Sequence, residues 1–291
     1  MDLAIQSGAR GSRSASSRDE AIRQGRLILL AEDNPVNLEV ILEQLRLLGH
    51  AADAAVNGSA ALAMSRAMRY GLLLTDCNMP EIDGFALTAR IRAAEREAGT
   101  ARRLPIVALT ANASGGEERR CREAGMDDYL SKPVAMAILK AKLERWLPAA
   151  VPASMPAQAA PGNPEMQPIA TVDVCNLDGL TEVLGDDGQA LSGLLAEFCR
   201  LAAADLALLT QTAERCDARA TELSAHRLKG SARIVGARRL AECCEAIEIG
   251  ATVENWPAIR SACDRLPRLL SEVEDFIAAR DSGRSRSGAA D

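Results

Sequence analysis

The sequence is poor in aromatic residues and lacks long apolar runs. Aromatic side chains make up 2% of the 291 residues, which argues against stacking platforms for single-stranded nucleic acids. The net charge of −6, from 34 basic and 40 acidic residues, argues against a general nucleic-acid partner. No run reaches the roughly 20 apolar residues of a membrane span, and the N-terminus lacks the apolar core of a signal peptide. We therefore expect a cytoplasmic protein with no membrane span.

Cysteine pairs at metal-binding spacing are also missing. The eight cysteines include no C-x-x-C pair, and Cys243 and Cys244 are adjacent, which suits neither a zinc site nor an ordinary disulfide. Thiols in a reducing cytosol stay reduced. We expect structural thiols, with a redox role as the alternative.

The composition is that of a globular protein, with 48% hydrophobic and 25% charged residues. The length suits roughly two domains. A stretch rich in proline and alanine divides the chain, because such a sequence favours a semi-extended linker. The predicted organisation is a flexible segment over 1–24, a domain over 25–147, a linker over 148–171, a second domain over 172–280 and a disordered tail over 281–291.

The first domain alternates between short apolar runs and segments of helical periodicity. Five such repeats predict a parallel sheet with helices on both faces, a flavodoxin-like (βα)5 fold of the α/β class. Strands are expected over 26–34, 50–57, 72–76, 105–112 and 127–133, and helices over 37–49, 58–68, 85–99, 117–125 and 134–147.

Polar residues follow four of these strands where each strand ends. The first strand ends in Glu32 and Asp33, the third in Asp76, the fourth in Thr110, and the fifth in Lys132. The carboxyl ends of parallel strands meet at one edge of the sheet, where ligands bind. We therefore expect these side chains to form one site.

Three carboxylates in one site repel one another. A pair of like charges about 4 Å apart costs on the order of 4 kcal/mol at an effective dielectric constant near 20. A hard divalent cation with oxygen ligands, most simply Mg²⁺, would offset this repulsion. Asp76 as nucleophile, the metal and Lys132 as neutralising charges, and the Thr110 hydroxyl together match the needs of phosphoryl transfer.

These residues resemble the receiver domain of two-component response regulators. The resemblance implies that Asp76 is the phosphoacceptor, that Tyr129 is the switch aromatic and that the Lys132–Pro133 bond is cis. It implies Glu32, Asp33, Asp76 and the backbone carbonyl of Asn78 as Mg²⁺ ligands, with Thr110 and Lys132 contacting the phosphoryl group. The motifs that carry it are AEDN (31–34), TDCNMPEIDG (75–84), ALTAN (108–112) and DDYLSKPV (127–134).

The second domain shows no strand pattern and predicts an all-α bundle. Helical stretches are expected near 178–184, 187–215, 217–235, 237–250 and 256–280.

One helix of this domain carries a histidine on its polar face. His226, Lys229 and Gly230 share that face, so His226 should point at solvent or at a partner. A glycine inside a helix costs roughly 1 kcal/mol relative to alanine. Gly230 removes bulk one turn after His226, which would let another protein approach closely. Lys229 would neutralise negative charge on a modified imidazole, and histidine is a nucleophile near neutral pH.

The segment HRLKGSARIVGA (226–237) resembles the histidine phosphotransfer (HPt) domain, a four-helix bundle whose exposed histidine carries phosphate. The histidine, lysine and glycine of that family match His226, Lys229 and Gly230. A receiver followed by such a domain resembles the C-terminal end of hybrid sensor kinases of the Bvg and Evg kind. This layout implies transfer from a kinase histidine to Asp76, then to His226, then to an aspartate of a separate response regulator.

The sequence contains no Gly-rich ATP lid and no N-box-like segment. The chain is therefore not expected to phosphorylate itself from ATP, and it is either part of a larger kinase or a free-standing relay protein. Two alternatives remain. A haloacid-dehalogenase-like Mg²⁺ phosphatase would want a second acid two residues after the nucleophile, where this chain has Asn78. A phosphorylation-independent scaffold is the other.

Overall fold

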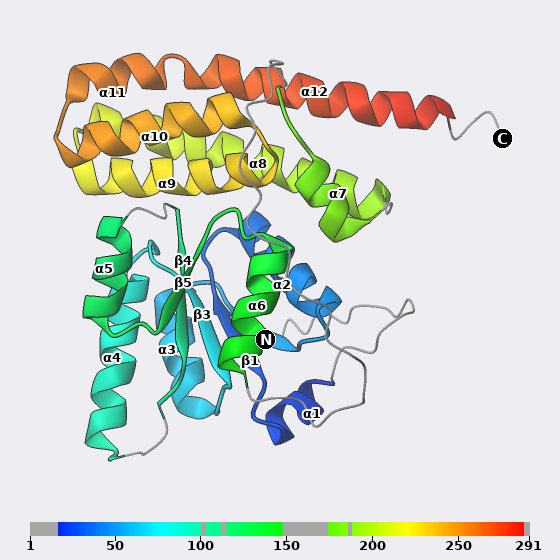
Figure 1. The fold of residues 1–291 in the computed structure, drawn as a ribbon. Coiled ribbons are helices and arrows are strands. Elements are labelled where there is room, and N and C mark those ends of the chain that lie inside the picture. The colour runs from blue at the N-terminus through cyan, green and yellow to red at the C-terminus, as the bar shows by residue number, and fades with distance from the viewer. Residues whose placement is uncertain (1–16, 100–102, 112–114, 148–173, 186–187, 288–291) are drawn as a thin grey trace.

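A computed structural model describes residues 17–99, 103–111, 115–147, 174–185 and 188–287. Within these ranges, the chain forms an α/β part and a helical part that lie against each other (Figure 1). The fold class predicted from the sequence is confirmed. The proposed linker over 148–171 lies outside the described residues.

The α/β part is built on a five-stranded parallel sheet of order β2-β1-β3-β4-β5. Every residue of β1, β3 and β4 is buried, as continuous apolar runs predict for strands covered on both faces. The chain reverses direction across the sheet between β1 and β3, which makes their ends the topological switch point. The strands are β1 (Ile28–Ala31), β2 (Ala52–Ala55), β3 (Leu72–Asp76), β4 (Ile106–Thr110) and β5 (Asp128–Ser131).

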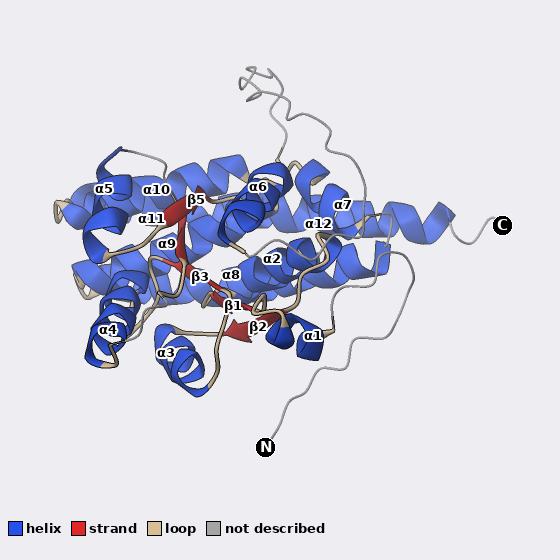
Figure 2. Cartoon of the chain, turned by 60° about the horizontal axis from the view of Figure 1, so that its bottom comes forward, coloured by secondary structure: helices blue, strands red, loops and turns tan. Residues whose placement is uncertain are grey.

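Helices cover both faces of this sheet (Figure 2). Successive strand residues alternate between two cores, because side chains of a strand point to opposite faces. Leu73 packs into the core beneath α3, α4 and α5, whereas Leu72 and Leu74 pack into the core beneath α2 and α6. The helices are α2 (Pro35–Leu47), α3 (Gly58–Ala67), α4 (Gly84–Glu97), α5 (Gly115–Ala124) and α6 (Met136–Trp146).

The helical part is a bundle with an aliphatic core around Phe198. Its longest helices lie side by side above the sheet in Figure 1. The predicted all-α architecture is confirmed. The helices are α7 (Asp178–Leu184), α8 (Gly188–Glu214), α9 (Ala218–Ile234), α10 (Arg238–Thr252), α11 (Trp256–Cys263) and α12 (Leu266–Ser287).

The predicted single helix over 256–280 is wrong, because the chain breaks between α11 and α12. Pro267 lies in the first turn of α12, and a proline there cannot donate to a preceding helical turn. The predicted loose tail from residue 281 is also wrong in part, since α12 continues to Ser287.

The described end of the N-terminal segment, from residue 17 onward, is helical where the sequence analysis expected flexibility. Residues Arg18–Arg23 form helix α1, capped by the Ser17 hydroxyl, which accepts from the backbone of Glu20. Ala21 of this helix is buried in the core beneath α3 and α4. Arg18 donates two hydrogen bonds of 2.7 Å to the carboxylate of Asp53 in β2. These tertiary contacts hold the helix together with the local Ser17 cap.

Neither a membrane-spanning helix nor a disulfide bond is present in the described part of the chain. None of its helices is long and apolar enough to cross a membrane. All eight cysteines lie within the described residues, and none forms a disulfide.

Candidate functional site

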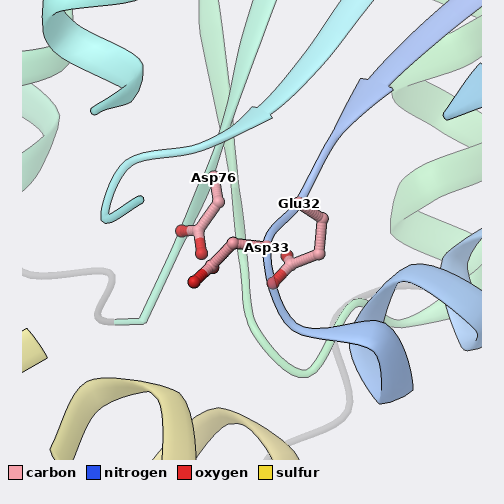
Figure 3. A group of neighbouring side chains, drawn as sticks. All are labelled: Glu32, Asp33 and Asp76. Atoms are coloured by element: carbon pink, nitrogen blue, oxygen red, sulfur yellow. The ribbon is translucent and has the colours of Figure 1, made fainter. Parts of the chain in front are cut away.

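The structure brings the strand-end carboxylates together. Glu32 and Asp33 follow β1 directly, and Asp76 is the last residue of the neighbouring β3. One oxygen from each of the three carboxylates lies within 4.8 Å of the other two. Figure 3 shows the three side chains converging at the end of the sheet. This geometry is that of an oxygen-ligand site for a hard cation.

Lys132 supplies one positive charge to the three acids. Its Nζ lies 2.6 Å from Oε2 of Glu32 and 2.8 Å from Oδ2 of Asp76. Both oxygens of Asp33 are buried and accept no hydrogen bond within the described structure. The cluster is therefore left with negative charge that Lys132 does not compensate.

The pKa values reflect this imbalance. Burial, with the nearby charge of Asp76 as a further contribution, raises the pKa of Asp33 to about 6. Burial also raises the pKa of Glu32 to about 7, against the opposing effect of Lys132. Burial disfavours the Lys132 ammonium, but Asp76 and Glu32 outweigh it and raise the pKa of Lys132. A divalent cation would relieve these costs, so the donor set fits one.

The loop after β3 fixes the carboxylate of Asp76. The backbone N–H of Asn78 donates to Oδ1 of Asp76 at 3.2 Å. Asp83 caps α4 by accepting from the backbone of Ala86, and Gly84 follows it. A Cβ at Gly84 would lie 2.2 Å from the backbone oxygen of Asp76, so only glycine lets α4 begin this close. The stretch TDCNMPEIDG thus holds its first aspartate in place.

The other predicted receiver residues lie around this edge of the sheet. Thr110 is buried at the end of β4. Tyr129 is half-buried, and its hydroxyl lies 3.4 Å from Oε2 of Glu118. The Lys132–Pro133 peptide bond is cis, as expected.

His226 of α9 faces this site. Nδ2 of Asn78 lies 3.4 Å from both ring nitrogens of His226. His226 is 8% exposed, so of the two expectations for its polar face, solvent or a partner, the structure excludes solvent in this arrangement. The receiver-like domain of the same chain covers it.

Glu248 of α10 is a residue that the sequence analysis missed. Its Oε1 lies 2.9 Å from Nδ1 of His226, and its Oε2 pairs with the ammonium of Lys229. Burial alone would raise the pKa of Glu248, but His226 and Lys229 together lower it. Because an ionised carboxylate only accepts, this contact fits an imidazole tautomer that carries its proton on Nδ1 and leaves the lone pair on Nε2. The sequence signal that could have pointed to Glu248 is its position one helical turn after Cys244.

The two domains also meet around His226. Nδ2 of Asn34 donates to the backbone oxygen of Arg227 at 3.1 Å. A guanidinium nitrogen of Arg233 donates to the backbone oxygen of Ala111 at 2.6 Å. Val36 and Val40 of α2 pack into the same apolar cluster as the bundle core.

Gly230 lies against α2 of the receiver-like domain. A Cβ there would lie 3.0 Å from Nδ2 of Asn37, a side chain that itself donates to Oε1 of Glu32 at 3.1 Å. The space predicted beside the histidine is thus filled by the neighbouring domain. Lys229 is paired with Glu248, which places its charge beside the imidazole.

A parallel five-stranded sheet with an acid cluster at its switch point, and a histidine presented by a helical bundle, define a phosphoryl-relay class of protein. Residues 28–144 belong to the response regulator receiver domain family, and residues 193–276 belong to the Hpt domain family. The chain therefore contains a response regulator receiver domain followed by an Hpt domain.

The similar proteins include sensor proteins. The chain is 36% identical to the virulence sensor protein BvgS of Bordetella pertussis over 234 residues, which are 79% of this chain and 19% of BvgS. It is 31% identical to the sensor protein EvgS of Escherichia coli over 254 residues, 87% of this chain and 19% of EvgS. The chain thus spans about a fifth of the length of these relatives. The receiver domain of sensor histidine kinase PA1611 from Pseudomonas aeruginosa is 45% identical, covers 42% of this chain and 97% of its own, and has a TM-score of 0.38.

Proposed function

We propose that Asp76 accepts a phosphoryl group from the phosphohistidine of a sensor histidine kinase and that His226 relays it. The observation that carries the proposal is the position of His226, which faces the loop of Asp76 across the domain interface. A phosphoryl donor and acceptor that lie together convert a bimolecular step into an intramolecular one.

The first step forms an acyl phosphate. A carboxylate oxygen of Asp76 attacks phosphorus, the P–N bond of the donor phosphohistidine breaks, and the electron pair returns to the donor imidazole. Lys132 lies 2.8 Å from this carboxylate and offsets the charge of the incoming group. The buried Thr110 hydroxyl is proposed as a hydrogen-bond donor to a phosphoryl oxygen, and Tyr129 as the side chain that reports phosphorylation to the α5–β5 surface.

Mg²⁺ is the cofactor we propose for the acid cluster. Glu32, Asp33, Asp76 and the backbone carbonyl of Asn78 would hold it, and the ion would supply charge that stabilises the transferring phosphoryl group. The support is the set of converging oxygens and the buried carboxylate of Asp33, whose oxygens accept no hydrogen bond within the described structure.

The second step moves the group to His226. Nε2 attacks phosphorus, the P–O bond to Asp76 breaks, and the aspartate carboxylate is restored. Glu248 accepts from Nδ1–H and keeps Nε2 as the nucleophile, and Lys229 beside it balances the charge of Glu248. The imidazole then transfers the group to an aspartate of a receiver in a response regulator.

The proposed partners are a sensor histidine kinase, on the same polypeptide or separate, and a downstream response regulator. Because the phosphoryl group derives from ATP through a kinase, we propose that these domains act in the cytoplasm. Position 78 carries an asparagine, whose amide faces His226. The phosphatase alternative needs a second acid at this position and therefore gains no support. Transfer to His226 itself would argue against a scaffold.

Labelling with acetyl phosphate and Mg²⁺ tests the proposal. In the His226→Gln background, Asp76→Asn should abolish the incorporation of base-labile phosphate, which is the property of an acyl phosphate. The incorporation is measured as mass gain on the intact chain. The matched control is Glu81→Gln, which alters an exposed acid five residues further on and should label as the parent does. Undiminished labelling of Asp76→Asn would remove the acceptor assignment.

A further inference from the structure

Arg227, the residue after His226, contacts carboxylates from two other parts of the structure. Arg227 lies on α9, and its guanidinium lies 3.5 Å from Oδ2 of Asp33 and 3.3 Å from Oδ1 of Asp205. Asp205 belongs to α8 of the bundle, and Asp33 belongs to the acid cluster of the receiver domain. One arginine thus bridges a carboxylate of its own domain and a carboxylate of the other.

Asp205 is a buried carboxylate of α8. It is 5% exposed and lies on the helix that also carries the buried Phe198 and Leu209. A buried carboxylate is costly unless it is paired, and Arg227 is the cation that the structure places against it. Both contacts are ion pairs, and Nε of Arg227 has no hydrogen-bond partner within the described structure, so Arg227 holds the two carboxylates through its charge.

The receiver domain also places a buried carboxylate, that of Asp33, at this interface. The side chain of Asp33 is 5% exposed, and neither of its oxygens accepts a hydrogen bond within the described structure. Lys132 is engaged by Glu32 and Asp76, so Arg227 supplies the nearest salt-bridge partner of Asp33. The backbone oxygen of Arg227 accepts from Asn34 next to Asp33, which fixes both ends of this residue at the interface.

We propose that Arg227, oriented by Asp205, is a positioning residue that docks the bundle on the acid cluster and aligns His226 with Asp76. The Asp205–Arg227–Asp33 bridge acts on docking, and phosphoryl transfer depends on it only through that alignment. The effect on phosphoryl transfer rests on the proposed relay function. Docking itself can be measured without any phosphoryl donor.

Hydrogen–deuterium exchange of the full chain, with EDTA and no phosphodonor, measures docking. The bundle covers Val36 and Val40 in the first turns of α2, so their amides report separation of the domains. Arg227→Ala and Asp205→Asn should each speed this exchange on the order of tenfold, the effect of losing one member of an interface charge pair. Arg227→Lys should restore part of the protection, because it keeps the charge but reaches only as a single ammonium group.

Arg219→Ala is the matched control, since Arg219 lies on the same helix and pairs with Glu222 on an exposed face. It should leave α2 exchange unchanged. Exchange of α9 amides around the buried Leu228 must stay slow in every variant, which separates lost docking from an unfolded bundle.

Transfer gives the second readout. With acetyl phosphate and Mg²⁺, the Asp205→Asn chain should acquire phosphate on Asp76 at the parental rate but pass it to His226 about tenfold more slowly. Unchanged α2 exchange in both Arg227→Ala and Asp205→Asn would overturn the proposal, whatever the labelling shows. An effect of Arg227→Ala without one of Asp205→Asn would overturn the role of Asp205. Failure of Asp76 to label in the parent would contradict the relay function and leave the docking result standing.

Discussion

The imidazole of His226 lies 3.4 Å from the side-chain amide of Asn78, a residue 148 positions earlier in the chain. Asn78 in turn donates its backbone N–H to Asp76. This relationship predicts transfer from Asp76 to His226 within one molecule. The first-order rate constant for appearance of phosphohistidine should be the same when the chain is diluted a hundredfold. Quenching in base at timed intervals, which preserves phosphohistidine, and intact-mass measurement check this.

A mixture of two variants provides the control for that prediction. The His226→Gln chain, labelled only on Asp76, and the Asp76→Asn chain, which keeps His226, can exchange phosphate only between molecules. Transfer in the mixture should be slower than in the parent and should depend on concentration. A parental rate that falls in proportion to dilution would contradict docking within one chain.

Glu248 should prove a positioning residue for His226. Glu248→Ala removes the acceptor of Nδ1–H and frees the imidazole to rotate, whereas Glu248→Gln keeps a neutral acceptor at the same place. We expect the single-turnover transfer rate to fall in the order parent, glutamine, alanine. The alanine variant should lose on the order of tenfold, about 1.4 kcal/mol of transition-state stabilisation. Equal rates for all three chains would show that the contact has no part in transfer.

Gly230→Ala should raise stability and lower transfer. Alanine stabilises a helix interior by about 1 kcal/mol relative to glycine, but its Cβ would lie 3.0 Å from Nδ2 of Asn37 in the docked domain. Gly193→Ala in α8 is the matched control, because no atom lies within 4 Å of a Cβ there. Both variants should melt a few degrees higher, and Gly230→Ala alone should transfer more slowly. A slowing by Gly193→Ala as well would assign the effect to helix stiffness instead of the interface.

Asp128 should make part of the stability depend on pH. It accepts from Lys142 at 2.6 Å and from the Trp146 indole at 2.9 Å. Burial raises its pKa, but these donors outweigh burial and hold the pKa of Asp128 below its ordinary value of 3.8. Because the folded-state pKa is lowered, this stabilisation is fully present above that ordinary value and is lost as pH falls through the folded-state pKa.

Thermal melts of the parent and of Asp128→Asn at several pH values check this prediction. The parent should melt a few degrees higher at neutral pH, the effect of about 1 kcal/mol from charged hydrogen bonds. The difference should shrink only in strongly acidic buffer. A difference that is constant from neutral pH to strong acid would mean that the charge of Asp128 contributes nothing.

Much of the receiver half follows from local patterns. Strand β3 and the acid at its end are visible as LLLTD, because a doubly covered strand reads as an unbroken apolar run and its end meets the ligand edge. The positions of Glu32, Asp33 and Lys132 follow from the same rule applied to the other strands.

The features that were missed depend on contacts between distant segments. Helix α1 has a weak local signal and is held by Asp53, 35 residues away. Glu248 reaches His226 from the neighbouring helix, 22 residues away. The burial of His226 depends on how two domains dock, and no periodicity within α9 encodes the surface that will cover it.

The most direct test of the account is to locate phosphate on the chain after a pulse of acetyl phosphate with Mg²⁺. Phosphohistidine, which is stable to base and labile to acid, should be found at His226 in the parent and should be absent from Asp76→Asn. An equal yield of phosphohistidine at His226 in Asp76→Asn would show that the group does not travel through Asp76, and it would contradict the relay.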